Sequence, residues 1–400
     1  VVPFLQNQQI DVVMQHEQKG TGHAVEQAKA SFTNSEQVLV LYGDVPLITP
    51  ETLQDLIESG DNNSLKVLTA ILEDPTGYGR IVRDYDDNML CITEEKDADE
   101  ETKLINEINT GIMCIPAKWL TEALSQLDNN NAQGEYYLTD LIAKAVNQGI
   151  EINSVTCEDE MEVAGINNRV QLAEVESYYQ QLKATELMMS GVTFRDPARV
   201  DIRGDIKAGQ DITIDINVIF EGNNTIADNV SIGANCILIN SIIHEGAEIL
   251  PNSIIENAEV GANCSVGPFA RLRPGTKLAA KAKVGNFVEV KNANIGLGSK
   301  INHLSYIGDT DMGADVNIGA GTITCNYDGA NKHRTVIGDR VFVGSDTQLV
   351  APVTVEDGAT IGAGSTIRKT APADALTLTK SEQKTVKGWQ RPVKNKQPFK

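Results

Sequence analysis

His303 is the residue best suited to proton transfer in a repetitive stretch of this sequence. It follows Ile301 by two positions, so its side chain is expected to point away from the core that Ile301 enters. Imidazole exchanges protons near neutral pH, which suits a general base. Tyr306 adds a second polar group three residues later. An isolated surface histidine is usually inert, so a catalytic and a merely solvated His303 both stay open at this point.

Basic side chains recur in the same stretch. Arg271 and Arg273 flank Leu272, so both are expected to face outward, and Lys291 follows Val290 in the same way. A guanidinium group can hold a phosphate through two parallel hydrogen bonds. Solvation explains any single surface lysine, but positive groups on neighbouring repeats favour a site for a phosphorylated ligand.

A carboxylate follows an apolar segment nearer the N-terminus. Residues 37–42 predict a short strand, and Gly43 and Asp44 come directly after it. Mg²⁺ prefers oxygen ligands, often a carboxylate together with substrate phosphates. Alone, the pair is better explained as a turn. The same holds for the glycine-punctuated turn at Gly20 and Thr21, although N–H groups at a helix start can also contact anions.

A six-residue period positions the first group of residues. Apolar residues recur at every sixth position in two long runs, with shorter runs before them. This period fits neither a helix nor a single alternating strand, but it is typical of short strands joined by turns in stacked coils. We therefore predict a parallel β-helix from about residue 200 to residue 370, and we expect the glycines after the apolar positions to form its corners. The two long runs are Val260, Val266, Leu272, Leu278, Val284, Val290 and Ile337, Val343, Leu349, Val355, Ile361, Ile367.

The remaining segments suggest a second domain and a connector. Residues 325–334 interrupt the repeat with a polar, turn-rich insertion, which in stacked repeats often lies on the binding face. Residues 168–190 have helical periodicity, and the segments before them alternate between strand and helix patterns, typical of an α/β sheet. We expect a first domain at 1–167, a linker helix at 168–190, and a β-helix domain with a C-terminal tail at 191–400.

Composition excludes several classes of protein. The net charge is -21, from 55 acidic and 34 basic side chains, which argues against a nucleic-acid partner. The six cysteines are widely spaced, which favours reduced thiols in a cytoplasmic protein over disulfides or a zinc site. No apolar run approaches the length needed to cross a membrane, so no membrane partner is expected.

Several long stretches together resemble one bacterial enzyme family, the bifunctional N-acetylglucosamine-1-phosphate uridyltransferases and glucosamine-1-phosphate acetyltransferases. The resemblance covers essentially the whole chain. It implies an α/β, Rossmann-like nucleotidyltransferase domain, incomplete here, and a left-handed β-helix that assembles as a homotrimer with acetyl-coenzyme A between subunits. The stretches that carry it are residues 41–47, 74–80, 107–112, 129–137, 267–275, 284–289 and 317–332.

The resemblance also implies roles for residues of the β-helix, which would acetylate the amine of glucosamine-1-phosphate. His303 matches the general base, and Arg273 and Lys291 match ligands of the sugar phosphate. Tyr306 and Asn317 match contacts to the sugar or to the developing tetrahedral centre. The oxyanion donor stays open between a backbone N–H near Ala320 and the Tyr306 hydroxyl. The positions that match coenzyme A contacts are Ala320, Asn326, Tyr327, Ser345, Ala363 and Lys380, the last standing where the family is expected to use arginine.

For the first domain, the resemblance implies uridylyl transfer from UTP to N-acetylglucosamine-1-phosphate with Mg²⁺. Asp44 and Asn167 match the metal ligands, within a wider set that matches the UDP-sugar site. The family's glycine-rich phosphate loop would precede Val1, so we expect the chain as given to be deficient in this activity. The UDP-sugar positions are Gln15, Gly20, Thr21, Tyr42, Gly43, Asp44, Gly79, Glu94, Asn109 and Asn167.

Other interpretations remain at this point. The chain could be a single-activity sugar nucleotidyltransferase whose β-helix only forms trimers, and His303 with the 325–334 insertion argues against this. A zinc hydratase would need clustered histidines, whereas His244, His303 and His333 are far apart in the sequence. A non-enzymatic trimeric scaffold would show no turnover.

Overall fold

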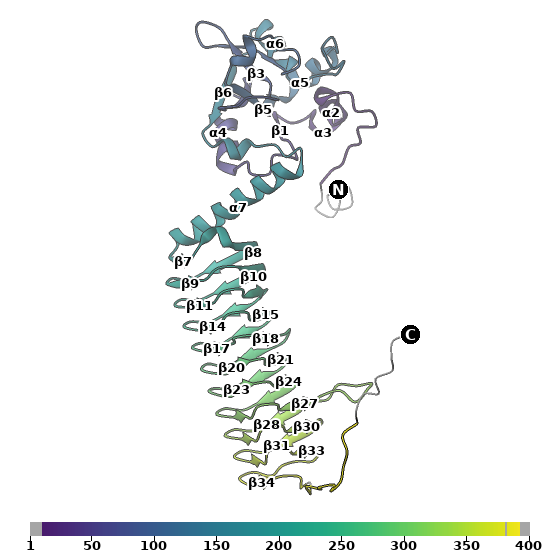
Figure 1. The fold of residues 1–400 in the computed structure, drawn as a ribbon. Coiled ribbons are helices and arrows are strands. Elements are labelled where there is room, and N and C mark those ends of the chain that lie inside the picture. The colour runs from purple at the N-terminus through teal and green to yellow at the C-terminus, as the bar shows by residue number, and fades with distance from the viewer. Residues whose placement is uncertain (1–9, 381, 393–400) are drawn as a thin grey trace, which may run out of the picture. The chain divides into compact units, whose positions relative to one another are not determined.

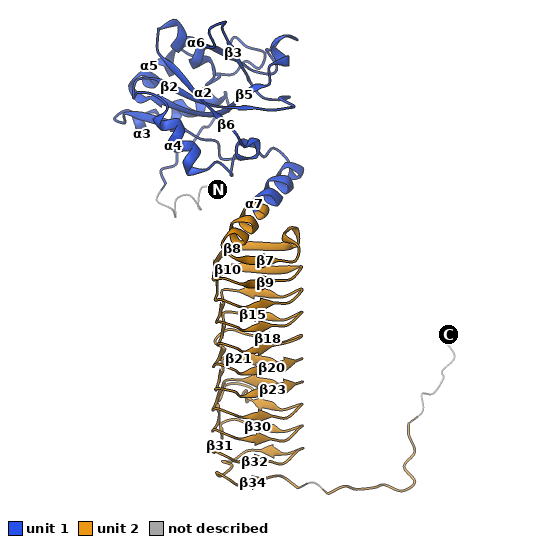
Figure 2. Ribbon diagram, turned by 90° about the vertical axis from the view of Figure 1, so that its left-hand side faces the viewer, with its two compact units in different colours: residues 1–179 blue, residues 180–400 orange. Residues whose placement is uncertain are grey.

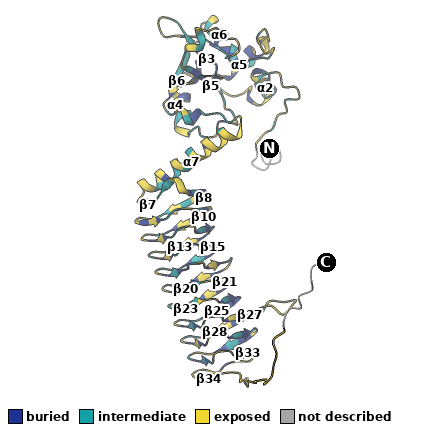
Figure 3. Ribbon diagram, viewed as in Figure 1, coloured by how far each residue is buried: buried dark blue, intermediate teal, exposed yellow. Residues whose placement is uncertain are grey.

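The computed structural model describes residues 10–380 and 382–392. The chain divides into two compact units, residues 1–179 and 180–400, and the division falls within helix α7, Arg169–Met189 (Figure 2). Much of α7 is exposed, as Figure 3 shows. Within the described residues, no helix combines the length and the apolar character that a membrane span requires.

The first unit is built on a six-stranded mixed sheet with the order β4-β3-β5-β2-β6, and β1 pairs with β5. Strand β5 runs antiparallel to β1, β2 and β3, whereas β2 and β6 are parallel. The strand predicted at 37–42 is observed as β1, which ends at Val40. The strands are β1 Gln37–Val40, β2 Leu65–Ile71, β3 Arg80–Arg83, β4 Met89–Thr93, β5 Glu107–Pro116 and β6 Ile152–Cys157.

Helices cover both faces of this sheet, which explains why β5 is buried along nearly its whole length without alternation. Ile112 and Cys114 of β5 pack with Leu56 of α4, while Met113 and Ile115 face the opposite core with Leu120 of α5. The helices are α2 Thr21–Gln27, α3 Lys29–Phe32, α4 Pro50–Glu58, α5 Ala117–Ala123 and α6 Asp140–Asn147, with short 3₁₀ helices at Thr102–Leu104, Leu124–Gln126 and Glu160–Val163.

The second unit is the predicted parallel β-helix (Figure 1). Its first face is an 11-stranded sheet from β7 to β34, and the other strands form the remaining faces. A 3₁₀ helix lies at Pro197–Arg199. The strands are β7 Val192–Phe194, β8 Val200–Ala208, β9 Ile212–Ile214, β10 Val218–Ile226, β11 Ser231–Ile232, β12 Ile237–Ile239, β13 Ile242–Ile243, β14 Glu248–Ile249, β15 Ile254–Glu256, β16 Glu259–Val260, β17 Ser265–Val266, β18 Arg271–Leu272, β19 Lys277–Leu278, β20 Lys283–Asn286, β21 Glu289–Lys291, β22 Asn294–Ile295, β23 Lys300–His303, β24 Tyr306–Gly308, β25 Thr310–Met312, β26 Asn317–Ile318, β27 Ile323–Cys325, β28 Thr335–Ile337, β29 Phe342–Val343, β30 Gln348–Val350, β31 Val353–Val355, β32 Thr360–Ile361, β33 Thr366–Ile367 and β34 Leu376–Thr377.

The six-residue period fills the interior of the coils. Every residue of the two long apolar runs is buried, and they belong to one continuous core. The register follows from this, because a shift by one residue would turn each aliphatic side chain outward. The stack extends beyond the predicted limits, from β7 at Val192 to β34 at Thr377.

The prediction for the repeat glycines is right at Gly267, whose φ is 108°, but at other repeat positions the physical reason differs. Gly261, Gly285 and Gly344 do not have positive φ; instead, a Cβ on Gly285 would stand 2.0 Å from the carbonyl oxygen of Asn302 on the next coil. These glycines allow two coils to approach closely. Most of the non-glycine corner residues with positive φ are Asn or Asp, which tolerate this conformation.

Candidate active sites on the sheet domain and the β-helix

A cleft of about 480 Å³ opens on the first unit beside the ends of several strands. It brings together most of the predicted UDP-sugar residues, although their positions in the sequence are far apart. Gln15, Gly20 and Gly43 do not line it. The predicted residues that do are Thr21, Tyr42, Asp44, Gly79, Glu94, Asn109 and Asn167.

The two predicted metal ligands line the same cleft because their loops are tied together. The N–H of Ile166 donates to the carbonyl of Asp44 at 2.9 Å, and the N–H of Asn167 donates to Gln171 at 2.8 Å. The exposed Asp44 carboxylate and the Asn167 amide oxygen are both hard donors that suit Mg²⁺. No cluster of three or more His, Cys, Asp or Glu side chains with metal-binding geometry occurs within the described ranges.

Glu94 and Tyr42 are partly buried polar groups in this cleft. Burial raises the pKa of both side chains, and the charge of Glu94 adds to the effect on Tyr42. Thr139 donates a hydrogen bond of 2.8 Å to Glu94. Gly111, with φ 85°, leaves room for the Tyr42 ring, since a Cβ there would lie 2.5 Å from it. These contacts fix the two side chains at the wall of the cleft.

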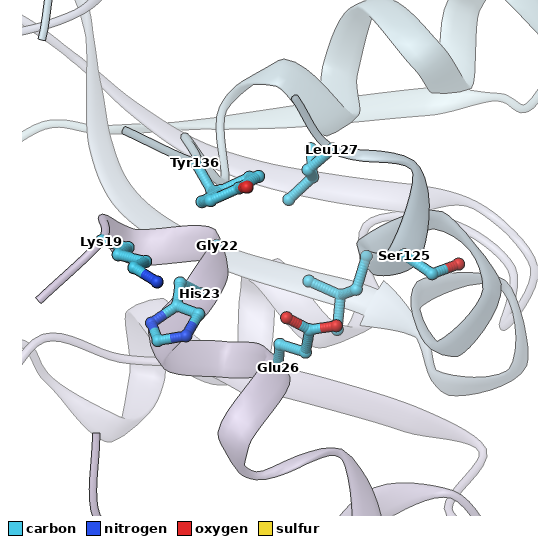
Figure 4. Close-up of a pocket in the computed structure, with 8 residues that line it drawn as sticks. Lys19, Gly22, His23, Glu26, Ser125, Leu127 and Tyr136 are labelled. Carbon is cyan, nitrogen blue, oxygen red and sulfur yellow. The ribbon is translucent and has the colours of Figure 1, made fainter. Parts of the chain in front are cut away.

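Gln15 lies beside a second, smaller cavity of about 280 Å³. Its amide nitrogen lies 3.0 Å from Nδ1 of His23 and donates to the Gly20 carbonyl. Figure 4 shows His23 and Glu26 of α2 facing Leu127 and Tyr136 across this cavity. Two of the predicted UDP-sugar residues are thus separated: Thr21 lines the large cleft, whereas Gln15 contacts a residue of the small cavity.

On the β-helix, the predicted base and three predicted coenzyme A contacts form one column. Parallel pairing aligns Ile301, Ile318, Val343 and Ile361 on successive coils of the first face. The residue two positions after each one occupies the same place at the coil edge. This edge column consists of Asn286, His303, Ala320, Ser345 and Ala363.

The edge column offers an open strip beside an exposed histidine. His303, Ser345 and Ala363 are exposed and Ala320 is half-buried. The side chains that follow His303 are small, so a thin, extended ligand could lie along them. Among the described residues, no protein group accepts a hydrogen bond from the Ala320 N–H. Lys380 is exposed and directly follows Thr379, whose N–H donates to Ser365 on the last coil.

The predicted phosphate ligands lie on a neighbouring face. Leu272 pairs with Val290, which places Arg273 next to Lys291, and Glu289 pairs with Tyr306. Arg273 forms an ion pair of 2.8 Å with Glu289, and this contact raises the pKa of Arg273. Asn317 lies instead on the first face, in β26. One chain therefore does not bring Asn317 onto the face of Arg273 and Lys291.

The 325–334 insertion folds against the face that carries Arg273 and Lys291, which we call the basic face. Asp309 accepts hydrogen bonds from Nδ2 of Asn292 and of Asn326, and it is buried. Burial raises the pKa of Asp309, but these hydrogen bonds and the nearby lysine charges outweigh burial and lower it. Asn326 Nδ2 also lies 3.4 Å from the Tyr306 hydroxyl. Tyr327, by contrast, is exposed and donates to the carbonyl of Gly329.

Sequence reasoning missed three polar residues at this site. Lys332 lies beside Lys291, and that contact, by hydrogen bond and by charge, lowers the pKa of Lys332. Only the folded insertion could reveal this pair. Asp309 was not singled out, because its partners Asn292 and Asn326 come from other coils. Asn286 occupies the position of His303 one coil earlier, so the repeat register could have identified it.

Comparisons with known proteins agree with this two-part organisation. A model described as nucleotidyl transferase matches residues 5–180. A GMPPB C-terminal domain model matches residues 202–300, and a model of six bacterial transferase hexapeptide repeats matches residues 334–369.

Two relatives match nearly the whole chain. The bifunctional protein GlmU of Marinobacter nauticus is 52% identical over 390 residues, which cover 98% of this chain and 86% of that protein. The bifunctional protein GlmU of Cupriavidus pinatubonensis is 55% identical over 380 residues, covering 95% and 84%. The chain therefore belongs to the bifunctional GlmU family, with a nucleotidyltransferase domain and a hexapeptide transferase domain.

Proposed function

We propose that this protein acetylates the amine of glucosamine-1-phosphate with acetyl-coenzyme A and then joins the product to UMP from UTP, with release of pyrophosphate. The observation that carries the proposal is the edge column, which aligns His303 with Ala320, Ser345 and Ala363. A β-helix that served only to form trimers would not need an exposed histidine at the head of an open strip next to a basic face.

In the acetyl transfer, His303 removes a proton from the ammonium group of the sugar, since a protonated amine cannot attack a thioester. The amine nitrogen then bonds to the acetyl carbon and loses a second proton as the C–S bond breaks. The thiolate of coenzyme A takes up one of the two protons, and the other passes to solvent. The free N–H of Ala320 is next to His303 in the edge column and is the better candidate for the oxyanion donor. The Tyr306 hydroxyl accepts a hydrogen bond from the Asn326 amide, which leaves its own O–H free, but Tyr306 lies on another face of the coil, in β24.

The basic face would bind the sugar phosphate. Arg273 and Lys291 are adjacent on the second unit, and Lys332 adds a third positive group. An anion placed between the two lysines would relieve their mutual repulsion, which is the physical reason for the lowered pKa of Lys332.

The cleft of the first unit would bind the nucleotide sugar. Asp44 and Asn167 would hold Mg²⁺, which supplies positive charge to the phosphates during uridylyl transfer. Tyr42, Gly79, Glu94 and Asn109 line the same cleft and would contact the sugar.

We propose a homotrimer because the acetyl-transfer residues occupy different faces of one chain. Asn317 lies on the first face, whereas Arg273, Lys291 and Tyr306 lie on another. A neighbouring copy could supply the missing face. The coil corner beside His303 is apolar and exposed in the single chain, with Phe269, Phe287 and Leu304 on successive coils, and a second copy would cover it.

The domain limits and the compartment are further proposals. We propose a transferase domain at 1–167, a connecting helix at 168–190 and an acetyltransferase domain at 191–400, although the division into compact units falls inside α7. All six cysteines are unpaired, which favours the reducing cytoplasm.

The test is release of free thiol from acetyl-coenzyme A, measured with and without glucosamine-1-phosphate. We expect release that requires the sugar phosphate and that fails with N-acetylglucosamine-1-phosphate, whose nitrogen is already acylated. No sugar-dependent release from a folded protein would favour the alternative of a single nucleotidyltransferase activity, which is tested by pyrophosphate release from UTP.

A further inference from the structure

One hydrogen bond in the edge column involves the ring of His303. Nδ1 of His303 lies 2.7 Å from Oδ1 of Asn286. The two residues are direct partners in the parallel pairing of β20 with β23, so their side chains leave the coil edge side by side. Ala320, on the other side of His303 in the column, has no polar side chain that could compete for the ring.

The chemistry of the two atoms determines the state of the imidazole. An amide oxygen only accepts hydrogen bonds, so the Nδ1 that contacts it must carry the proton. In the neutral ring, Nε2 then keeps its lone pair, and this is the atom able to take a proton from an amine. An amide turned the other way would donate to Nδ1 and leave the neutral ring without a free basic nitrogen.

The backbone holds this pair in place. The N–H of Leu304 donates to the carbonyl of Asn286 at 3.1 Å. Gly285 permits close contact between the two coils at this point, since a Cβ there would meet the Asn302 carbonyl. The next residue, Phe287, stacks on Phe269 of the preceding coil with ring centroids 5.3 Å apart. Asn286 therefore projects from an ordered corner.

We propose that Asn286 is a positioning residue that fixes His303 as the Nδ1–H tautomer and directs Nε2 toward the substrate amine. This inference rests on the base role proposed for His303 and adds a second residue to it. Asn286 does not touch the substrate; it acts through the ring. The charged groups on the strands packed around this pair are Lys283 on β20 and Lys300 on β23, both three residues earlier, while β26 presents the neutral Asn317.

The test compares Asn286→Leu with Asn286→Asp by the pH dependence of sugar-dependent thiol release. Loss of the orienting partner of a metal-bound histidine typically costs about 10- to 100-fold in activity, and we take that scale for the orienting partner of a catalytic histidine. We expect Asn286→Leu to lower kcat by at least about tenfold on that scale, with the KM of both substrates nearly unchanged. Asn286→Asp restores an acceptor for Nδ1–H and should recover most of kcat.

The aspartate variant has a second signature that a purely structural role would not produce. A carboxylate beside the imidazole favours its charged form, so the pKa of His303 rises. Because the base must be deprotonated, the acidic limb of kcat/KM should move to higher pH by about one unit. Asn294→Leu is the matched control. Asn294 also makes a side-chain hydrogen bond across coils, in this case by donating to Asp311 at 2.7 Å, but it lies in β22, away from the edge column.

The outcomes separate this inference from the proposed function. Full kcat in Asn286→Leu, or an unshifted acidic limb in Asn286→Asp, would overturn the positioning role, provided that His303→Ala is inactive. An active His303→Ala would overturn the base role itself. If Asn294→Leu loses as much kcat as Asn286→Leu, the effect belongs to the coil stack and the inference is also refuted.

Discussion

Replacing Gly308 by alanine is a demanding test of the geometry around Tyr306. A Cβ at this position would stand 2.4 Å from the Tyr306 hydroxyl and 2.8 Å from Nδ2 of Asn326. Ordinary contact begins at 3.4 Å, so the hydroxyl must move by roughly 1 Å. Both neighbouring groups are side-chain ends, so the coil should tolerate the change while the site does not.

The expected loss follows from that displacement. A misplacement of about 1 Å at a reacting centre can cost on the order of 100-fold in rate. We therefore expect acetyl transfer in Gly308→Ala to fall by about 10- to 100-fold in kcat/KM, while the thermal midpoint and the oligomeric state change little. The assay is thiol release with glucosamine-1-phosphate varied, and thermal unfolding serves as the control.

A double-mutant cycle makes the cause specific. In a Tyr306→Ala background, the added methyl group no longer meets the hydroxyl, so Gly308→Ala should cost much less. Wild-type kcat/KM in the single variant would refute the reasoning. Equal losses in both backgrounds would refute it as well, because the methyl group would then act without Tyr306.

Three further predictions concern charged groups of the two sites. Asp309→Asn replaces an acceptor of two amide hydrogen bonds, one of them from the buried Asn326. The substitution should lower the free energy of unfolding by about 1–3 kcal/mol. It should also raise the KM for glucosamine-1-phosphate. The pKa of Asp309 is lowered in the folded protein, so its carboxylate contributes fully to the free energy of unfolding above the ordinary carboxyl pKa. This contribution is lost as the pH falls through the folded pKa, so the free energies of unfolding of the variant and the wild type, measured with denaturant, should converge in acid. A difference in free energy that stays constant with pH would contradict this. Burial raises the pKa of Glu94, so the ionised carboxylate lowers the stability of the folded protein above the folded pKa. Glu94→Gln should therefore raise the thermal midpoint near neutral pH but not below about pH 4, where the carboxyl group is protonated in both states. The same variant should bind the sugar more weakly in calorimetry. Lys380→Arg should lower the KM for acetyl-coenzyme A by about three- to tenfold, since arginine adds a second parallel hydrogen bond to a phosphate; an unchanged KM would remove Lys380 from that site.

The sequence was sufficient to predict the β-helix because its signal is strictly local. Most inward aliphatic residues stand six residues from the next one, as Val284 and Val290 do, and one core contains them all. The first coils were harder to delimit. Strands β8 and β10 pair over nine residues, and Ile206, six residues after Val200, is only partly buried, since these long strands do not follow the short repeat.

The candidate sites were predictable in part. The edge column follows from counting two residues after each inward position, so His303, Ala320 and Ser345 could be placed together once the register was known. The Asp309 network could not be predicted. It depends on how the insertion at 325–334 folds back, which brings Asn326 and Lys332 to Asp309 and Lys291 through side-chain contacts that no repeat specifies.

The mixed sheet of the first unit shows a similar limit. Strand β1 was predicted from its apolar residues, but the antiparallel pairing of β5 with β1 and β2 depends on contacts over more than 40 residues of sequence, such as Lys66 with Cys114. The cleft gathers Asp44, Glu94 and Asn167 from separate loops for the same reason.

The most direct test of the account is acetyl transfer by His303→Ala. The variant keeps the coil, because His303 is exposed and makes its side-chain hydrogen bond only to Asn286 among the described residues. We predict an unchanged thermal midpoint and oligomeric state, with a loss of about 100-fold or more in sugar-dependent thiol release, since general base catalysis contributes on the order of 100- to 10,000-fold. Near-normal release by a folded His303→Ala would contradict the edge column as the site of acetyl transfer.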